Sequence, residues 1–210
     1  MVNNMIIPGI LEDSWEEIEK KIEIAKTFTN KIHIDIIDGK FAPHTTFMDP
    51  APFKKYSKEI EFELHMMVEE PINYLKSWAD AGFQRFMGHI EKMSDQAEFV
   101  ARGELFGEVG LAIDSPTSID RIEVPVDDLD VVLIMCVKAG ESGQKFTEEN
   151  LKKITMTKNT FIPIEVDGGI NSETIIKAKN AGASRYVANS FIFEGNPKEQ
   201  FKQLQETLLH

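Results

Sequence analysis

Short apolar segments alternate with longer polar and amphipathic segments eight times along this chain of 210 residues. Apolar runs of this length, bounded by polar stretches or by Gly and Pro, are typical of buried strands. The pattern predicts eight strands at about residues 5–10, 31–37, 61–68, 84–90, 108–113, 130–137, 161–167 and 185–190.

The segments between these strands predict helices. Those with the clearest start signals cover about residues 14–28, 71–81, 147–157 and 172–181. Eight strand–helix units predict an α/β fold, a closed (β/α)8 TIM barrel that forms a single domain over residues 1–210. An open doubly wound sheet is the alternative, but Pro8-Gly9-Ile10-Leu11 is not the Gly-rich phosphate turn that usually follows its first strand.

The charge balance is strongly acidic, with 23 Lys and Arg against 35 Asp and Glu and a formal net charge of −12. Such a surface repels nucleic acid and anionic lipid, so neither is an expected partner. No apolar run is long enough to span a bilayer, and the first residues do not form a signal peptide. We therefore expect a cytoplasmic protein, and the single cysteine, Cys136, fits a reducing compartment.

Polar side chains interrupt the predicted strands at every second position. In the strand at 31–37, His33 and Asp35 alternate with isoleucines, so they share the face opposite the apolar one. If the isoleucines pack on helices, the His and the Asp point into the barrel. An isolated buried carboxylate is very unfavourable, so either an internal ion pair or a bound cation must compensate Asp35.

The same alternation places His65 beside Glu63 on the strand at 61–68 and Asp167 beside Glu165 on the strand at 161–167. His33, Asp35, His65 and Asp167 should then converge near the C-terminal ends of strands, where the active sites of barrels lie. Two imidazoles and two carboxylates suit one divalent ion of Zn, Fe, Mn or Co. A metal-free polar network is the alternative.

Several motifs, in order along nearly the whole chain, resemble those of the ribulose-phosphate 3-epimerase family. They are His33-Ile34-Asp35-Ile36-Ile37-Asp38-Gly39, His65-Met66-Met67-Val68-Glu69-Glu70-Pro71, Gly110-Leu111-Ala112-Ile113, Gly143-Gln144-Lys145-Phe146 and Glu165-Val166-Asp167-Gly168-Gly169-Ile170-Asn171. The resemblance implies that His33, Asp35, His65 and Asp167 bind the metal. It also implies that Asp35 and Asp167 are the acid and base that invert C3 of D-ribulose 5-phosphate, through an enediolate, to give D-xylulose 5-phosphate.

The phosphorylated ketose should contact the loops that follow the last two strands, as in many barrels. We expect substrate or phosphate contacts from Gly9, Met67, Ser142, Gly143, Gly168, Gly169, Asn189 and Ser190. Met135 matches another family position that lines the site. His89 and Glu91 match a further motif, and we expect them to support the site rather than to bind the ion. We also expect a homo-oligomer.

Departures from the family pattern concern substrate recognition. Gly9 stands where the family usually has Ser, Ile37 where it has Met, and Asn189 where it has Gly. Glu141 places a carboxylate in the expected lid, residues 139–146. The substrate could thus be another ketose phosphate, such as D-allulose 6-phosphate, or the chain could be a non-catalytic metabolite-binding barrel.

Related phosphate-binding barrels, the decarboxylases and hexulose-phosphate synthases, carry Asp-x-Lys-x-x-Asp on an early strand. Asp35-Ile36-Ile37-Asp38 offers no such lysine. This segment therefore argues against both of those activities.

Overall fold

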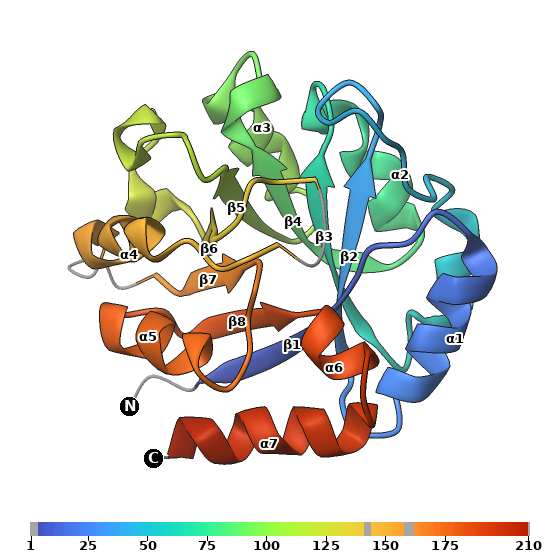
Figure 1. The fold of residues 1–210 in the computed structure, drawn as a ribbon. Helices are drawn as coiled ribbons and strands as arrows, with labels where there is room; N and C mark the ends of the chain where they lie inside the picture. The colour runs from blue at the N-terminus through green and yellow to red at the C-terminus, as the bar shows by residue number, and fades with distance from the viewer. Residues whose placement is uncertain (1–3, 141–143, 158–161, 210) are drawn as a thin grey trace.

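Eight parallel strands close into one barrel in the order β1 to β8, and helices surround it (Figure 1). The structure is a computed structural model that describes residues 4–140, 144–157 and 162–209. The strands are β1 (Met5–Ile10), β2 (Lys31–Ile37), β3 (Glu61–Met67), β4 (Phe83–His89), β5 (Glu108–Ile113), β6 (Val131–Met135), β7 (Ile164–Asp167) and β8 (Arg185–Ala188). The predicted (β/α)8 TIM barrel is confirmed, and the last three strands are shorter than predicted.

Each strand pairs with the next, and β8 pairs with β1 to close the barrel, with Pro8 opposite Ala188. The alternation in β2 has the predicted consequence, because Ile32, Ile34 and Ile36 belong to the large apolar layer between strands and helices. A smaller apolar cluster fills the inside of the barrel with Ile37, Met67, Met87, Ala112, Val131, Leu133 and Met135 among its members. The period of two in the sequence therefore divides each strand between these two layers.

The α-helices are α1 (Trp15–Ala25), α2 (Leu75–Asp80), α3 (Gln96–Gly103), α4 (Leu151–Thr157), α5 (Thr174–Ala181), α6 (Ser190–Phe193) and α7 (Pro197–Leu209). Local signals set their ends. The Ser14 side chain caps α1 by accepting a hydrogen bond from the Glu17 N–H. Gly82 and Gly182, which follow α2 and α5, have φ of 100° and 121°, a conformation that glycine adopts without strain.

Helices are shorter than predicted, and two of the intervals between strands contain only 3₁₀ turns. These turns are η1 (Ala51–Tyr56) between β2 and β3, and η4 (Ile119–Arg121) and η5 (Val126–Asp128) between β5 and β6. The expectation of eight strand–helix units is therefore wrong at these two intervals. In the second interval Pro116 and Pro125 limit the length of any helix, whereas Pro50 and Pro52 lie at the start of η1, where a missing N–H is tolerated, so they do not explain the first interval.

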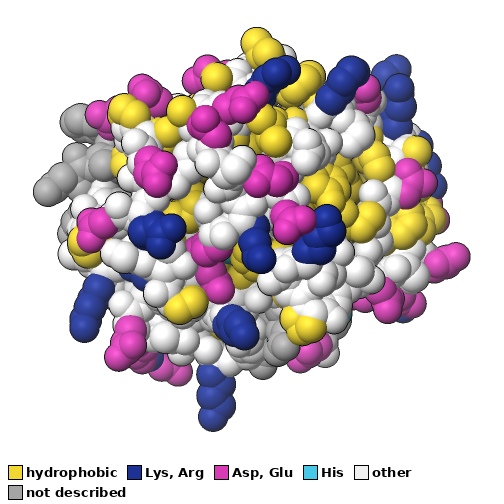
Figure 2. All heavy atoms as spheres, turned by 90° about the horizontal axis from the view of Figure 1, so that it is seen from above, with side chains coloured by type: hydrophobic (Ala, Val, Ile, Leu, Met, Phe, Trp, Pro, Cys, Tyr) yellow, Lys and Arg dark blue, Asp and Glu magenta, His cyan; other side chains and the backbone are white. Residues whose placement is uncertain are grey.

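Further 3₁₀ turns precede the helices that follow β3, β4 and β6. They are η2 (Pro71–Asn73), η3 (Ile90–Lys92) and η6 (Glu148–Asn150). Among the described residues, no helix combines the length and the apolar character that a membrane crossing needs. Acidic and basic side chains are interspersed on the face of the molecule shown in Figure 2.

Candidate metal and active site

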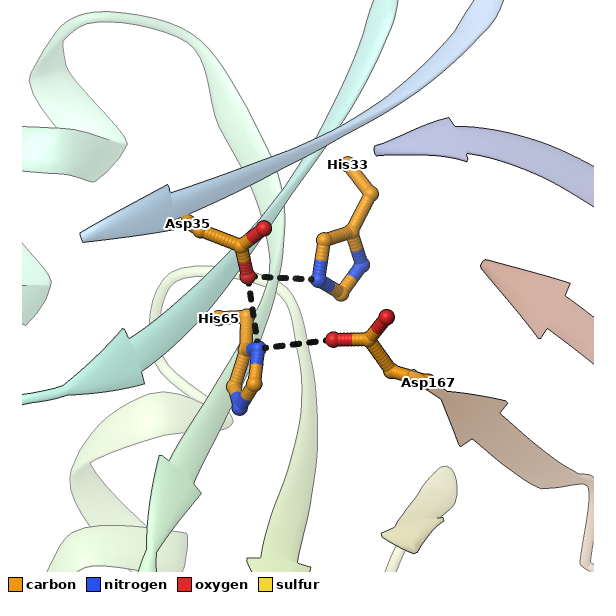
Figure 3. Close-up of side chains that lie close together, drawn as sticks. All are labelled: His33, Asp35, His65 and Asp167. Atoms are coloured by element: carbon orange, nitrogen blue, oxygen red, sulfur yellow. Dashed lines mark hydrogen bonds and ion pairs between the residues drawn. The ribbon is translucent and has the colours of Figure 1, made fainter. Parts of the chain in front are cut away.

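Four polar side chains meet inside the barrel near the C-terminal ends of three strands. β2 contributes His33 and Asp35, β3 contributes His65, and Asp167 is the last residue of β7. Figure 3 shows the four side chains turned toward one another, and one ligand atom from each lies within 4.8 Å of the others. The structure therefore brings together the four residues that the sequence indicated as a metal site.

Asp35 and His65 are central to the contacts in this cluster. The Asp35 Oδ1 lies 2.7 Å from Nδ1 of His65 and 3.3 Å from Nε2 of His33. The Asp167 Oδ2 lies 3.6 Å from the same Nδ1 of His65. Both histidines are fully buried. They present different ring nitrogens to the carboxylates, Nε2 from His33 and Nδ1 from His65.

The two aspartates differ in their electrostatic surroundings. Burial raises the pKa of Asp35, but the charge on His33 and hydrogen bonds from both histidines outweigh it and hold this pKa well below its usual value. Burial and the negative charge of Asp35 raise the pKa of Asp167 to about 6. Two carboxylates whose pKa values are pushed apart in one site are typical of acid–base pairs.

The donor set fits a divalent cation. It combines two imidazole nitrogens with carboxylate oxygens from two aspartates, a mixture found at Zn, Fe, Mn and Co sites. Repulsion from Asp35 contributes to the raised pKa of Asp167, and a cation between them would relieve that repulsion. His33, Asp35, His65 and Asp167 could thus hold one ion.

A network of buried charges lies next to this cluster, on the first half of the strands. His33 Nδ1 lies 2.8 Å from Oε1 of Glu63. Arg185 of β8 forms ion pairs with Glu63 and Glu165, and Arg85 of β4 donates to Glu63 at 3.1 Å. His33, Glu63 and Glu165 also have spacing that a metal could use. The two arginines already neutralise these carboxylates, so we assign the group as an ion-pair network.

A cavity opens above the cluster and is lined by Asp35 and Asp167 together with much of the predicted substrate site. The predicted residues that line it are Met67, Met135, Gly168, Gly169, Asn189 and Ser190. Gly9 does not line it and lies on β1, where an added Cβ would be 2.7 Å from Val187 Cγ1. Ser142, Gly143 and Glu141 lie outside the described residues.

The cavity also contains residues that sequence reasoning missed. They are Leu11, Val137 and Val187, whereas Gly140 and Gln144, which also line it, belong to the expected lid, and Ile170 belongs to the last motif of the resemblance. Most of these are apolar, and a hydrophobic residue at the end of a barrel strand has no signal that separates it from the core. Gly168, which was predicted, has a φ of 102° in the region that favours glycine, and a Cβ there would meet Val137 at 2.4 Å.

Solved structures of similar shape are barrels with little sequence identity to this chain. KGPDC from Streptococcus mutans superposes with a TM-score of 0.76 over 100% of this chain and 98% of that chain, at 10% identity. The 3-keto-L-gulonate-6-phosphate decarboxylase from Vibrio cholerae superposes with a TM-score of 0.75 over 99% and 98%, at 13% identity. At these identities the similarity shows the fold alone.

Sequence comparison is more specific. Ribulose-phosphate 3-epimerase of Schizosaccharomyces pombe is 32% identical over 218 residues, covering 100% of this chain and 96% of that protein. The Bacillus subtilis protein of the same name is also 32% identical, over 90% of this chain and 91% of that protein. The model of the ribulose-phosphate 3 epimerase family matches residues 5–193. The chain therefore belongs to the ribulose-phosphate 3-epimerase family, a family of isomerases.

Proposed function

We propose that this protein is a metal-dependent epimerase that inverts C3 of a ketose phosphate, converting D-ribulose 5-phosphate to D-xylulose 5-phosphate. The observation that carries the proposal is that Asp35 and Asp167 belong to one His/Asp cluster and line one cavity. The relatives named ribulose-phosphate 3-epimerase support the choice of substrate. A cytoplasmic location and homo-oligomeric assembly stay predictions.

The reaction needs a proton removed from C3 on one face of the substrate and a proton delivered to C3 on the other face. The electron pair of the broken C–H bond enters the neighbouring carbonyl group, which gives an enediolate, and it returns to C3 when the new C–H bond forms. Asp35 and Asp167, one for each face, form the smallest acid–base set for this exchange. His33 and His65, together with these aspartates, would hold a divalent ion of Zn, Fe, Mn or Co, which would stabilise the developing negative charge.

Other residues of the cavity would position the substrate. Gly168 and Gly169 both have positive φ, at 102° and 68°, so the backbone after β7 can approach a phosphate closely. Asn189 and Ser190 line the same cavity at the end of β8. Buried Met67 would limit the access of water to the reacting carbon. Contacts from Gly9, Ser142 and Gly143 stay predictions.

Exchange at C3 tests this function directly. Metal-loaded protein in D₂O is incubated with D-ribulose 5-phosphate, and in parallel with D-allulose 6-phosphate, and each sugar is followed by proton NMR. We expect loss of the C3 proton signal and appearance of D-xylulose 5-phosphate in the first reaction, at a higher kcat/KM than in the second. A faster reaction with D-allulose 6-phosphate would change the substrate, and the absence of exchange from both sugars would contradict the function.

A further inference from the structure

A line of hydrogen bonds leads from His65 away from the cluster and toward β5. His65 Nε2 lies 2.8 Å from Nε2 of His89, the last residue of β4. His89 Nδ1 lies 2.9 Å from Oε2 of Glu91, and Glu91 Oε1 accepts the N–H of Asp114 at 2.8 Å. Both imidazoles are fully buried and their rings stack with centroids 4.9 Å apart. The chain of contacts is therefore shielded from water over most of its length.

The contacts restrict where the ring protons can sit. Burial raises the pKa of Glu91, but the hydrogen bond from His89 outweighs it and lowers this pKa to about 2, so the carboxylate is an acceptor only. With one proton on each ring, a single arrangement pairs a donor with an acceptor at both contacts of the His89 ring. His89 Nδ1–H donates to Glu91, and His65 Nε2–H donates to the lone pair on His89 Nε2.

This arrangement leaves a lone pair on Nδ1 of His65, the nitrogen that faces Asp35 and Asp167. Without an ion, a proton on Nδ1 serves the 2.7 Å hydrogen bond to Asp35, and a bound cation would take the place of that proton. We propose that His89 and Glu91 are positioning residues that fix the tautomer of His65 and so prepare its Nδ1 to bind the metal ion. The inference rests on the proposed metal site and gives the physical means by which these two residues, already expected to support the site, act on it without touching the ion.

The other histidine of the cluster, His33, contacts a carboxylate directly and uses its two ring nitrogens in the opposite order to His65. His33 Nδ1 meets Glu63 directly at 2.8 Å, and its Nε2 faces Asp35. A carboxylate thus fixes His33 through one contact, whereas His65 needs the intermediate ring of His89 to reach Glu91. Hydrogen bonds to the second nitrogen of a metal-binding histidine commonly set its tautomer and raise its basicity.

Substitutions in the chain separate a positioning role from a structural one. Glu91→Gln has one amide oxygen, which can accept from the Asp114 N–H or from His89 but not from both. If it accepts from Asp114, the amide NH₂ faces His89 and donates to it, which would reverse the tautomers of both histidines. His89→Leu removes the acceptor for His65, whereas His89→Gln retains an oxygen that can accept. Glu69→Gln is the matched control, because it removes the same charge from an exposed carboxylate that pairs with Lys40.

The measurement is the affinity of the metal-free protein for Zn²⁺, by competition with a chromophoric chelator. We expect Glu91→Gln and His89→Leu to bind Zn²⁺ about 10- to 100-fold more weakly than wild type. His89→Gln should lose less, and Glu69→Gln should match wild type. Nitrogen-15 NMR of the five histidine rings in the Zn²⁺-loaded wild type should place protons on Nε2 of His65 and Nδ1 of His89.

Each result decides the matter. Wild-type affinity in both Glu91→Gln and His89→Leu overturns the positioning role, as does an equal loss in Glu69→Gln. A wild-type protein that binds no Zn²⁺ contradicts the metal site itself, which is a separate failure. Thermal unfolding of each metal-free variant checks its fold, and the partly exposed position of Glu91 keeps the test valid if His89→Leu does not fold.

Discussion

Lys21 of helix α1 lies 3.3 Å from the side-chain oxygen of Asn189, which lines the cavity at the end of β8. Lys21 also pairs with Glu12 at 2.5 Å, so its ammonium group is held in place. With the amide oxygen occupied, the NH₂ group of Asn189 is the part that can donate to a ligand. The described residues that line the cavity include carboxylates but no Lys or Arg. Glu12 balances the charge of Lys21, so the effect of Lys21 on an anionic substrate would be to orient the Asn189 amide.

We expect Lys21→Met to raise KM for D-ribulose 5-phosphate with little change in kcat, because binding remote from C3 is largely uniform. Loss of an oriented hydrogen bond to a charged ligand should cost about 1 to 2 kcal/mol, which is roughly a 5- to 30-fold increase in KM. Steady-state kinetics measures it. Lys20→Met, on the exposed side of the same helix, is the control, and an unchanged KM in Lys21→Met would remove Lys21 from substrate binding.

Asp35→Asn and Asp167→Asn should each nearly abolish turnover. The loss of a positioned acid or base lowers the rate by about 10²- to 10⁴-fold, and a weakened metal site would add to it. The comparison is kcat at saturating Zn²⁺ or Mn²⁺ for each variant and for Asp80→Asn, whose carboxylate is on the surface. Without the ion, both cluster variants should unfold at temperatures close to that of metal-free wild type. Near wild-type turnover in either one is incompatible with a two-aspartate mechanism.

Removal of the metal should lower stability, since an ion that binds only the folded state stabilises it. At a free ion concentration of 100 times Kd, the gain in the free energy of unfolding is about 2.7 kcal/mol. Thermal unfolding with EDTA and with added Zn²⁺ should show this difference in wild type, and His33→Ala should abolish it. His44→Ala, which removes a histidine outside the cluster, should retain it. The same unfolding temperature with and without the ion in wild type would argue against the site.

The period-two alternation allowed the sequence to predict much of the site. A strand in a closed barrel has one face toward the helices and one toward the interior, so a polar residue between two isoleucines has only one direction to point. His33 and Asp35 follow this rule, and the same rule applies to His65 and Asp167. The register between the strands then brings these residues to the same level along the barrel axis. This register follows from the fold and not from local sequence.

Contacts between distant segments could not be predicted in this way. Arg185 is 122 residues from Glu63, and Lys21 is 168 residues from Asn189. No pattern within one strand or helix specifies such partners, because they depend on how strands and helices pack. The 3₁₀ turns between β2 and β3 and between β5 and β6 were likewise not predicted, although prolines lie in both segments.

The buried network around Arg185 leads to a prediction for stability. Arg185, Glu63 and Glu165 are all at most 5% exposed, and Arg185 Nε donates to Glu165 Oε2 at 2.5 Å. Arg185→Met would leave both carboxylates without this partner inside the barrel. Glu63 keeps its contacts with Arg85 and His33, but Glu165 loses its arginine. Removal of one member of a buried ion pair typically costs about 3 to 5 kcal/mol, because the remaining charge, here Glu165, is buried without its partner. Urea unfolding followed by tryptophan fluorescence should show a loss of this size.

The control for this prediction is Lys177→Met, which breaks ion pairs with Glu148 and Glu173 on the surface. It should change the free energy of unfolding little, because water solvates the released carboxylates. The double variant Arg185→Met/Glu165→Gln should be less destabilised than the sum of its single variants, because the neutral amide that replaces the Glu165 carboxylate no longer needs the guanidinium. If Arg185→Met and Lys177→Met lower stability equally, the network does not carry uncompensated charge when Arg185 is lost. Water would then have to reach Glu63 and Glu165 through the N-terminal end of the barrel.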